Sequence, residues 1–197
     1  MAQKRNAARR RRRRRRDTTG IILRLIVFAL IAFIIGLVVW FVLHDRDLRS
    51  GISALKKEQY EEAIMCFDDS IAEDKNVAEC WRGKGMAYYE MKDYKKAVRC
   101  FKTALEEGGK IDAQFCNLVA LSYINQKKYK PALRWLQEGL AQTDASDELI
   151  MEMRYQQVLC YEKTAQWDLA RENAESYTSD YPDDQKMIRE YRFLQTR

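Results

Sequence analysis

The sequence predicts an all-α protein in which one apolar helix precedes a solenoid of about four helical hairpins and a C-terminal capping helix. Three observations lead to this prediction. An apolar run covers residues 21–43, and a motif with a period near 34 residues fills most of the remaining chain. The 197 residues also contain only two prolines and eight glycines. Because both residue types interrupt helices, their scarcity favours helical structure along the chain.

Positive charge is concentrated at the N-terminus. Residues 1–17 hold ten Lys or Arg, including the unbroken run Arg9 to Arg16, against the single acid Asp17. This segment carries +9 and the whole chain +6, so the remainder carries about −3. A mildly acidic remainder does not indicate a globular domain that binds nucleic acid. We expect residues 1–20 to be a disordered cytoplasmic tail, because they lack the apolar residues of a core.

Three roles are open to the arginine run, and the first is our preferred interpretation. As a topogenic signal it keeps the N-terminus in the cytoplasm and needs no partner. It can also contact anionic lipids of the cytoplasmic leaflet, at about 1 kcal/mol per basic residue near the surface. Finally, it can bind the phosphates of RNA without sequence preference.

Residues 21–43 read IILRLIVFALIAFIIGLVVWFVL and carry one charge, Arg24. A helix of this length spans roughly 35 Å, enough to cross a hydrocarbon core of about 30 Å. A helix buried in a soluble core is seldom apolar on every face for so long. Arg24 can reach the headgroups from near the start of the run, and Trp40 suits the far interface. We predict a transmembrane helix.

The helix is predicted to be an uncleaved signal anchor. A cleaved signal peptide has a shorter apolar region followed by small residues, whereas this run ends in Trp40, Phe41, Val42 and Leu43. The positive-inside rule then places residues 44–197 on the extracytoplasmic side of the cell membrane. An insertion pathway with other rules would leave them facing the cytosol, which is the alternative.

An internal repeat organises the chain after the apolar run. Five residues recur after 34 positions, and later copies are shifted by 35 and 38. The extra residues fall in the polar stretch 142–148, where a loop can absorb them. The first recurrence links Gly51, Tyr60, Ala63, Cys66 and Phe67 to Gly85, Tyr94, Ala97, Cys100 and Phe101.

This pattern resembles the tetratricopeptide repeat, in which Trp, Leu-Gly and Tyr on a first helix precede Ala, Phe and Ala on a second, and then Pro. The second copy matches best, although Lys84 replaces the usual Leu and Gly109 the usual Pro. The third copy has Ala120 and Leu136 at the Gly and Phe positions, and the fourth has Val158 and Ala174. The signature residues are Gly51, Tyr60, Ala63, Phe67, Trp81, Gly85, Tyr88, Tyr94, Ala97, Phe101, Tyr123, Tyr129, Ala132, Tyr161, Ala170 and Pro182.

Apolar residues at spacings of three and four give each expected helix one inward stripe. The resemblance covers 44–182, divided near 44–77, 78–112, 113–146 and 147–182, and residues 183–197 follow it. A last helix at 184–194 is expected to cover the apolar end of the array. The expected helix pairs are 46–57 with 60–73, 77–91 with 93–107, 112–125 with 129–141, and 147–164 with 166–180.

No residue pattern indicates catalysis, a cofactor or a metal. The one histidine, His44, has no evident partner, and no C-x-x-C, phosphate loop or nucleophile motif occurs. We therefore expect a protein that is not an enzyme and needs no cofactor.

The five cysteines can be interpreted in two ways, as free thiols or as disulfide-bonded pairs. The preferred one is buried apolar packing, since free cysteine behaves as a small hydrophobic residue. The alternative is a pair of disulfides between successive hairpins, Cys66 with Cys80 and Cys100 with Cys116, which leaves Cys160 unpaired.

The resemblance implies a concave groove, lined by the first helices, that binds a peptide of another protein. The implied function is a membrane-anchored scaffold or adaptor in cell-envelope assembly or beside the secretion machinery; the alternative is a tether facing the cytosol. Repeats that grip chaperone C-termini use Lys and Asn where this chain has Leu48 and Ile52, which argues against that ligand. The candidate groove residues are Arg82, Met86, Tyr89, Asn117, Leu121, Ile124, Asn125 and Tyr155.

Overall fold

The structure is a computed structural model that describes residues 25–38 and 46–197. It divides into two compact units, one up to Arg46 and one over Asp47–Arg197. In the first unit residues 25–38 are helical, and large apolar side chains such as Phe28 are exposed. Within the two described ranges, no helix combines the length and the apolar composition needed to cross a bilayer. The predicted tail, and both ends of the helix predicted for 21–43, lie outside the described residues.

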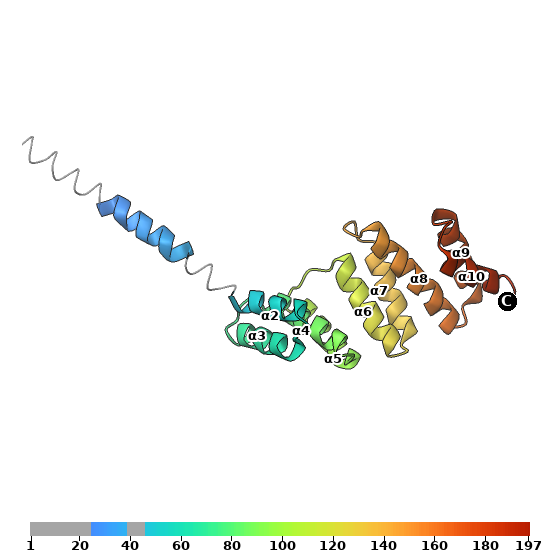
Figure 1. The fold of residues 1–197 in the computed structure, drawn as a ribbon, viewed down its shortest axis with the longest axis horizontal. Helices are drawn as coiled ribbons and strands as arrows, with labels where there is room; N and C mark the ends of the chain where they lie inside the picture. Colours follow the sequence, from blue (N-terminus) through green and yellow to red (C-terminus); the bar gives the residue numbers. More distant parts are fainter. Residues whose placement is uncertain (1–24, 39–45) are drawn as a thin grey trace, which may run out of the picture. The chain divides into compact units, whose positions relative to one another are not determined.

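The second unit, the repeat domain, is an all-helical array of four hairpins followed by one more helix (Figure 1). Each helix begins and ends within one residue of its expected position, and the predicted solenoid is confirmed. The hairpins are α2 (Arg46–Lys56) with α3 (Tyr60–Ala72), α4 (Val77–Glu90) with α5 (Tyr94–Glu106), α6 (Ala113–Asn125) with α7 (Tyr129–Leu140), and α8 (Asp147–Lys163) with α9 (Trp167–Asp180); α10 is Gln185–Leu194.

The same turn closes all four hairpins. A residue with φ between 57° and 62° reverses the chain after each first helix, and these residues are Glu58, Lys92, Lys127 and Ala165. The next residue donates its N–H to a carbonyl five positions earlier, as in Asp93 to Tyr88 at 2.9 Å. This bond satisfies a carbonyl that the helix end leaves open, which offsets the cost of the left-handed conformation.

The first helices lie on the inner side of the array. Helix α6 contacts both α4 and α8 across the hairpins that it separates. Phe101 of the second hairpin meets Phe115 of the third edge-on at 5.4 Å, and Phe115 meets Trp135 within the third hairpin at 6.0 Å. Aromatic rings therefore join the second and third hairpins, and the second helices are left on the outer side.

Glycines of the first helices make room for buried phenylalanines of the second helices. A Cβ on Gly85 would lie 2.5 Å from the Phe101 ring, and one on Gly51 would lie 2.5 Å from Phe67. Gly83 of α4 also makes room for Phe67, since its Cβ would lie 2.4 Å from that ring. Small residues therefore allow the helices to cross closely at these pairs. Gly83 was missed, because the repeat signature has no small residue at that position.

In the third and fourth hairpins, other residues fill the contact between the first and the second helix. At the positions of Gly85 and Phe101 they carry Ala120 with Leu136, and Val158 with Ala174, all fully buried. The residue on the second helix becomes smaller as that on the first becomes larger. Departures from the repeat signature at these positions therefore conserve volume, which packed cores tolerate well.

Lys84, which replaces the usual leucine, has a structural partner. Its ammonium forms an ion pair with Asp68 of α3 and lies 4.2 Å from the centre of the Trp81 ring. The residue is only 8% exposed. The lysine therefore joins the first hairpin to the second by charge, while its aliphatic stem packs between helices.

All five cysteines are free thiols, and four of them are buried. Burial raises the pKa of the Cys116 and Cys160 thiols to about 12. The alternative pairing is not formed, because the second cysteine of each proposed pair faces another group. Cys80 directs its Sγ to the carbonyl of Lys75 at 3.7 Å, and Cys116 packs where Gly139 leaves space. The packing interpretation describes the structure.

Candidate peptide groove

The candidate groove is the inner face of α4, α6 and α8, the helices that carry its eight predicted residues. Equivalent positions align across the repeats, with Arg82, Asn117 and Tyr155 at the start of the face and Met86 and Leu121 one turn later. Asn117 is buried, Asn125 is exposed, and the other six side chains are partly exposed. All eight thus belong to three helices of which the middle one, α6, contacts both α4 and α8.

Arg82 is bound within the repeat domain. Its Nη1 lies 2.5 Å from Oδ2 of Asp112 and its Nη2 lies 2.9 Å from Oδ1, and its guanidinium covers the Phe115 ring at 5.5 Å. Burial disfavours the charged form of Asp112, but hydrogen bonds from Arg82 and from the Phe115 N–H outweigh it and lower the pKa. A ligand carboxylate must therefore share Arg82 with Asp112 rather than meet a free cation.

Asp112 is a residue of this region that sequence reasoning missed. It is the N-cap of α6 and accepts a hydrogen bond from the Phe115 N–H at 2.7 Å, while the Ala113 N–H donates to Asp144 at 3.1 Å. An Asp directly before a helix is a recognisable capping signal. Its pairing with Arg82 was not recognisable, because the two residues lie on different hairpins.

Asn117 holds an unsatisfied hydrogen-bond acceptor. The residue is 4% exposed, and its Oδ1 is buried without a hydrogen-bond partner among the described residues. A buried polar atom left unpaired costs about 1–3 kcal/mol, so such atoms are uncommon outside functional sites. The oxygen can accept an N–H from a ligand that enters the face between α4, α6 and α8.

Apolar side chains surround this acceptor along the groove. Met86, Tyr89 and Ile124 pack partly buried against the main core, and Leu121 lies one turn after Asn117. Burial raises the pKa of the Tyr89 hydroxyl, so this ring stays neutral and can donate or accept a hydrogen bond. Asn125 donates to the Leu121 carbonyl of its own helix at 2.9 Å.

Helix α10 closes the far end of the groove. Burial first, and then the neighbouring Glu190 carboxyl of α10, raise the pKa of the Glu162 carboxyl to about 7. Burial and the acids Glu190 and Asp184 likewise raise the pKa of Tyr155. The last predicted groove residue therefore lies beside the capping helix, in a locally acidic environment.

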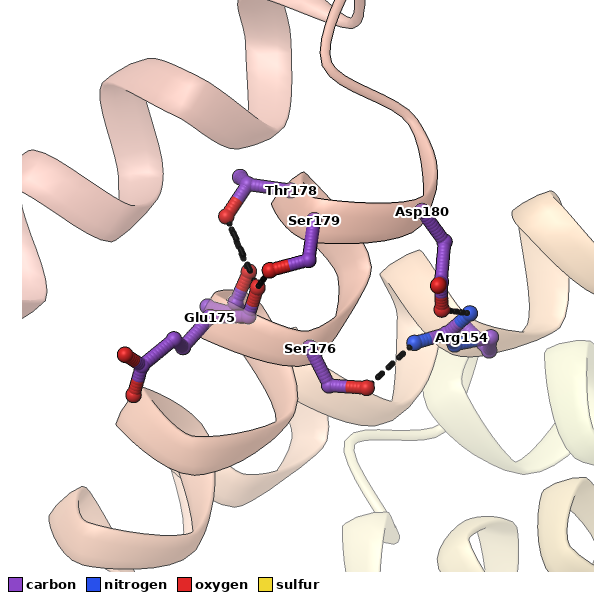
Figure 2. A network of polar contacts seen from close by, with 7 residues as sticks. Arg154, Glu175, Ser176, Thr178, Ser179 and Asp180 are labelled. Atoms are coloured by element: carbon purple, nitrogen blue, oxygen red, sulfur yellow. Dashed lines mark hydrogen bonds and ion pairs between the residues drawn. The ribbon is translucent and has the colours of Figure 1, made fainter.

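Arg154, next to Tyr155 in the sequence, links α8 to α9 (Figure 2). Its Nη1 lies 2.7 Å from Asp180 and its Nη2 lies 3.0 Å from the Ser176 hydroxyl. The guanidinium also lies over the rings of Tyr177 and Tyr181, at 5.5 and 5.6 Å. This residue orients the end of the groove rather than a ligand, and no sequence signal distinguished it.

The described side chains suit binding rather than coordination chemistry. Across residues 25–38 and 46–197, no three His, Cys, Asp or Glu side chains cluster in a way that could hold a metal ion. The inner face offers a buried acceptor, partly exposed apolar groups and a paired guanidinium.

Comparison with known proteins agrees with this geometry. Family models described as tetratricopeptide repeat match residues 78–107 and 152–184. The chain carries tetratricopeptide repeats. Proteins with this fold are typically protein-interaction scaffolds without enzymatic activity.

One curated relative is the Hsp70-Hsp90 organising protein of Plasmodium falciparum (isolate 3D7), 29% identical over 104 residues. The match covers 50% of this chain and only 18% of that protein.

Solved tetratricopeptide-repeat structures share the fold at low identity. YrrB, described as a TPR protein with an unusual peptide-binding site, superposes with a TM-score of 0.65 at 20% identity, over 74% of this chain and 73% of that one. MamA of Desulfovibrio magneticus RS-1 superposes with a TM-score of 0.66 at 20% identity, over 78% and 84%.

Proposed function

We propose that the protein is a membrane-anchored scaffold whose repeat domain binds an extended segment of another protein in the candidate groove. The observation that carries this proposal is the buried, unpartnered Oδ1 of Asn117 among apolar residues of three helices. An extended polypeptide presents regularly spaced N–H donors and side chains. One donor would satisfy Asn117, while neighbouring side chains would cover Met86 and Leu121.

The proposed partner differs from a chaperone tail. The name of the Plasmodium relative refers to Hsp70 and Hsp90, and a similar role would need polar residues at the start of the groove. This chain has Leu48, packed against the first hairpin, and Ile52, which is 41% exposed. Arg82, the next basic group, is already bound by Asp112. The groove therefore favours a segment with apolar side chains over a free C-terminal carboxylate.

The groove is tested with a photoreactive benzoylphenylalanine at Leu121, introduced into the full chain in its native cells. Irradiation is expected to yield a discrete adduct with one partner, and Asn117→Leu is expected to remove it. Because leucine eliminates an unpaired buried oxygen, this variant should unfold at an unchanged or higher denaturant concentration.

Asn173→Leu, an asparagine of outer helix α9, is the matched control and should leave the adduct intact. Two results would refute binding of the partner in the candidate groove. One is an adduct that persists in the Asn117→Leu variant; the other is an equal yield of adduct from a photoreactive group at the outward-facing Met65.

Anchoring and sidedness are further parts of the proposal. The apolar run 21–43 and the ten preceding basic residues support a single membrane crossing with the repeat domain outside the cytoplasm. A position beside the secretion machinery or in envelope assembly follows from that side. The second candidate is a tether whose repeats face the cytosol, reached by insertion that does not follow the charge rule.

Protease treatment of intact spheroplasts tests on which side of the membrane the repeat domain lies. With epitopes after Arg197 and before Lys4, we expect loss of the C-terminal epitope and survival of the N-terminal one. Survival of the C-terminal epitope until the membrane is opened would assign the repeats to the cytosol. That result would leave the groove proposal intact, since the groove does not depend on the compartment.

A further inference from the structure

The outer face of the repeat domain changes charge from hairpin to hairpin. Helix α3 carries four acids and no base, and α9 carries four acids and one base, Arg171. Between them, α5 carries four bases and one acid, and α7 carries two bases and one acid. The two central hairpins therefore present a basic outer face between two acidic ends.

The bases of this central face are available to a ligand. All six bases of α5 and α7 are exposed, and Lys96 is paired with Asp93 at 3.0 Å. In the described part of the chain the other five lie beyond ion-pair distance of any acid. These helices carry two acids, Glu106 and Glu138, and Glu138 accepts a hydrogen bond from Gln142 at 3.3 Å. The residues that we define as the central basic face are Lys95, Arg99, Lys102, Lys130 and Arg134.

A hollow of about 470 Å³ lies within this face. Its apolar lining consists of Ile111, Tyr123, Pro131 and Trp135. Its charged lining consists of two bases, Lys102 from α5 and Arg134 from α7, and one acid, Glu138 from α7, so the bases are in excess. The Trp135 ring is held edge-on against Phe115 at 6.0 Å, so this wall is fixed by the core beneath it. Ile111 is 38% exposed, so its side chain is accessible from the hollow.

We propose that this hollow docks an acidic segment of a partner protein, with one bulky apolar side chain inserted between Lys102 and Arg134. Charge complementarity selects the acidic segment, since its carboxylates meet bases that lack partners. The recess selects a polypeptide over a lipid surface, because a single side chain can fill it and a flat surface cannot. This second surface is formed by α5, α7, Ile111 and Tyr123, and it shares no residue with the candidate groove.

The test uses the full chain in non-ionic detergent micelles and a short peptide of glutamate and serine with a central benzoylphenylalanine. Irradiation is expected to cross-link the peptide to the walls of the hollow, at Ile111, Pro131 or Trp135, as located by mass spectrometry. Lys102→Glu with Arg134→Glu is expected to lower the yield about tenfold, since two attractions become repulsions.

Two controls separate this surface from others. Lys57→Glu with Lys186→Glu reverses two exposed charges on the first and last parts of the domain and should leave the yield unchanged. Asn117→Leu should also leave it unchanged, so failure of the groove proposal does not affect this one. Circular dichroism of each variant must match that of the unaltered chain.

Other occupants give distinct results, and each would overturn the proposal. Cross-links confined to residues 9–16 would show that the peptide binds only the arginine run. Chain-to-chain cross-links lost in the double variant would assign the face to a second copy. Sedimentation with phosphatidylserine vesicles that the double variant loses, without peptide cross-links at the hollow, would assign it to lipid.

Discussion

Replacement of Gly85 with alanine is expected to lower the free energy of unfolding of the repeat domain by about 2–3 kcal/mol, the cost of overpacking a core. Alanine forms helices better than glycine, by about 1 kcal/mol in an exposed helix, so the sign is opposite to intrinsic propensity. The reason is the Phe101 ring, which would lie 2.5 Å from the new Cβ and is fully buried. Denaturant unfolding followed by circular dichroism measures the change.

A second substitution should restore much of the loss. Phe101→Leu alone leaves a cavity and is expected to cost about 1–2 kcal/mol. Combined with Gly85→Ala, it reproduces the pair Ala120 and Leu136 of the third hairpin. The double variant should then be at least about 1 kcal/mol more stable than the sum of the single effects. Strict additivity, or an alanine variant as stable as the unaltered domain, would contradict the proposed size compensation.

Replacement of Asp112 with alanine is expected to cost about 2–3 kcal/mol, because one carboxylate has two partners. Loss of the cap on α6 accounts for about 1 kcal/mol. Loss of the ion pair leaves Arg82, whose side chain is 27% exposed, partly buried without its carboxylate. Thermal and denaturant unfolding of the purified chain measure the loss. Asp144→Ala, which removes the acceptor of the Ala113 N–H alone, should cost less.

The Asp112→Asn variant separates the contribution of the carboxylate charge to stability from that of helix capping. Asn can still accept the Phe115 N–H, so Asp112→Asn should be more stable than Asp112→Ala. The pKa of Asp112 is lowered in the folded domain, so its carboxylate stabilises the fold above the ordinary Asp value of about 4. That contribution is lost as pH falls through the lower, folded-state pKa. The Asn variant should lose less stability on acidification; equal acid sensitivity would show that other carboxyls dominate.

Local signals in the sequence were sufficient to place the helices. Turns such as Lys92–Asp93 and Lys127–Lys128 end the apolar stripes, and the repeated Gly, Ala and Phe fix which faces meet. The partners within the groove could not be found this way. Arg82 and Asp112 lie thirty residues apart, and Glu162 meets Glu190 only because α10 returns to the end of α8. Such contacts depend on how hairpins twist against one another, which no periodic pattern records.

For the predicted groove residues, too, the sequence predicts the helix position but not the contacts. Their helix and approximate face follow from repeat positions, yet the burial of Asn117 and the engagement of Arg82 depend on side chains from neighbouring hairpins. Gly83 illustrates the converse case. Its neighbour Phe67 belongs to the preceding hairpin, so the residue is needed for packing between repeats rather than within one.

The first hairpin contributes Ala54, Ala63 and Phe67 to a small core that is completed by Cys80 of α4 and is separate from the main core of the other hairpins. In an array held by nearest-neighbour contacts, an end unit with so little buried area opens at lower free energy than the centre. With the proposed anchor ahead of Arg46, tension between the membrane and a bound partner enters the domain through α2. The hairpin at residues 46–72 would then unfold and extend by up to roughly 90 Å. This extension would relieve the tension while α4, α6 and α8 stay folded and bound to the partner.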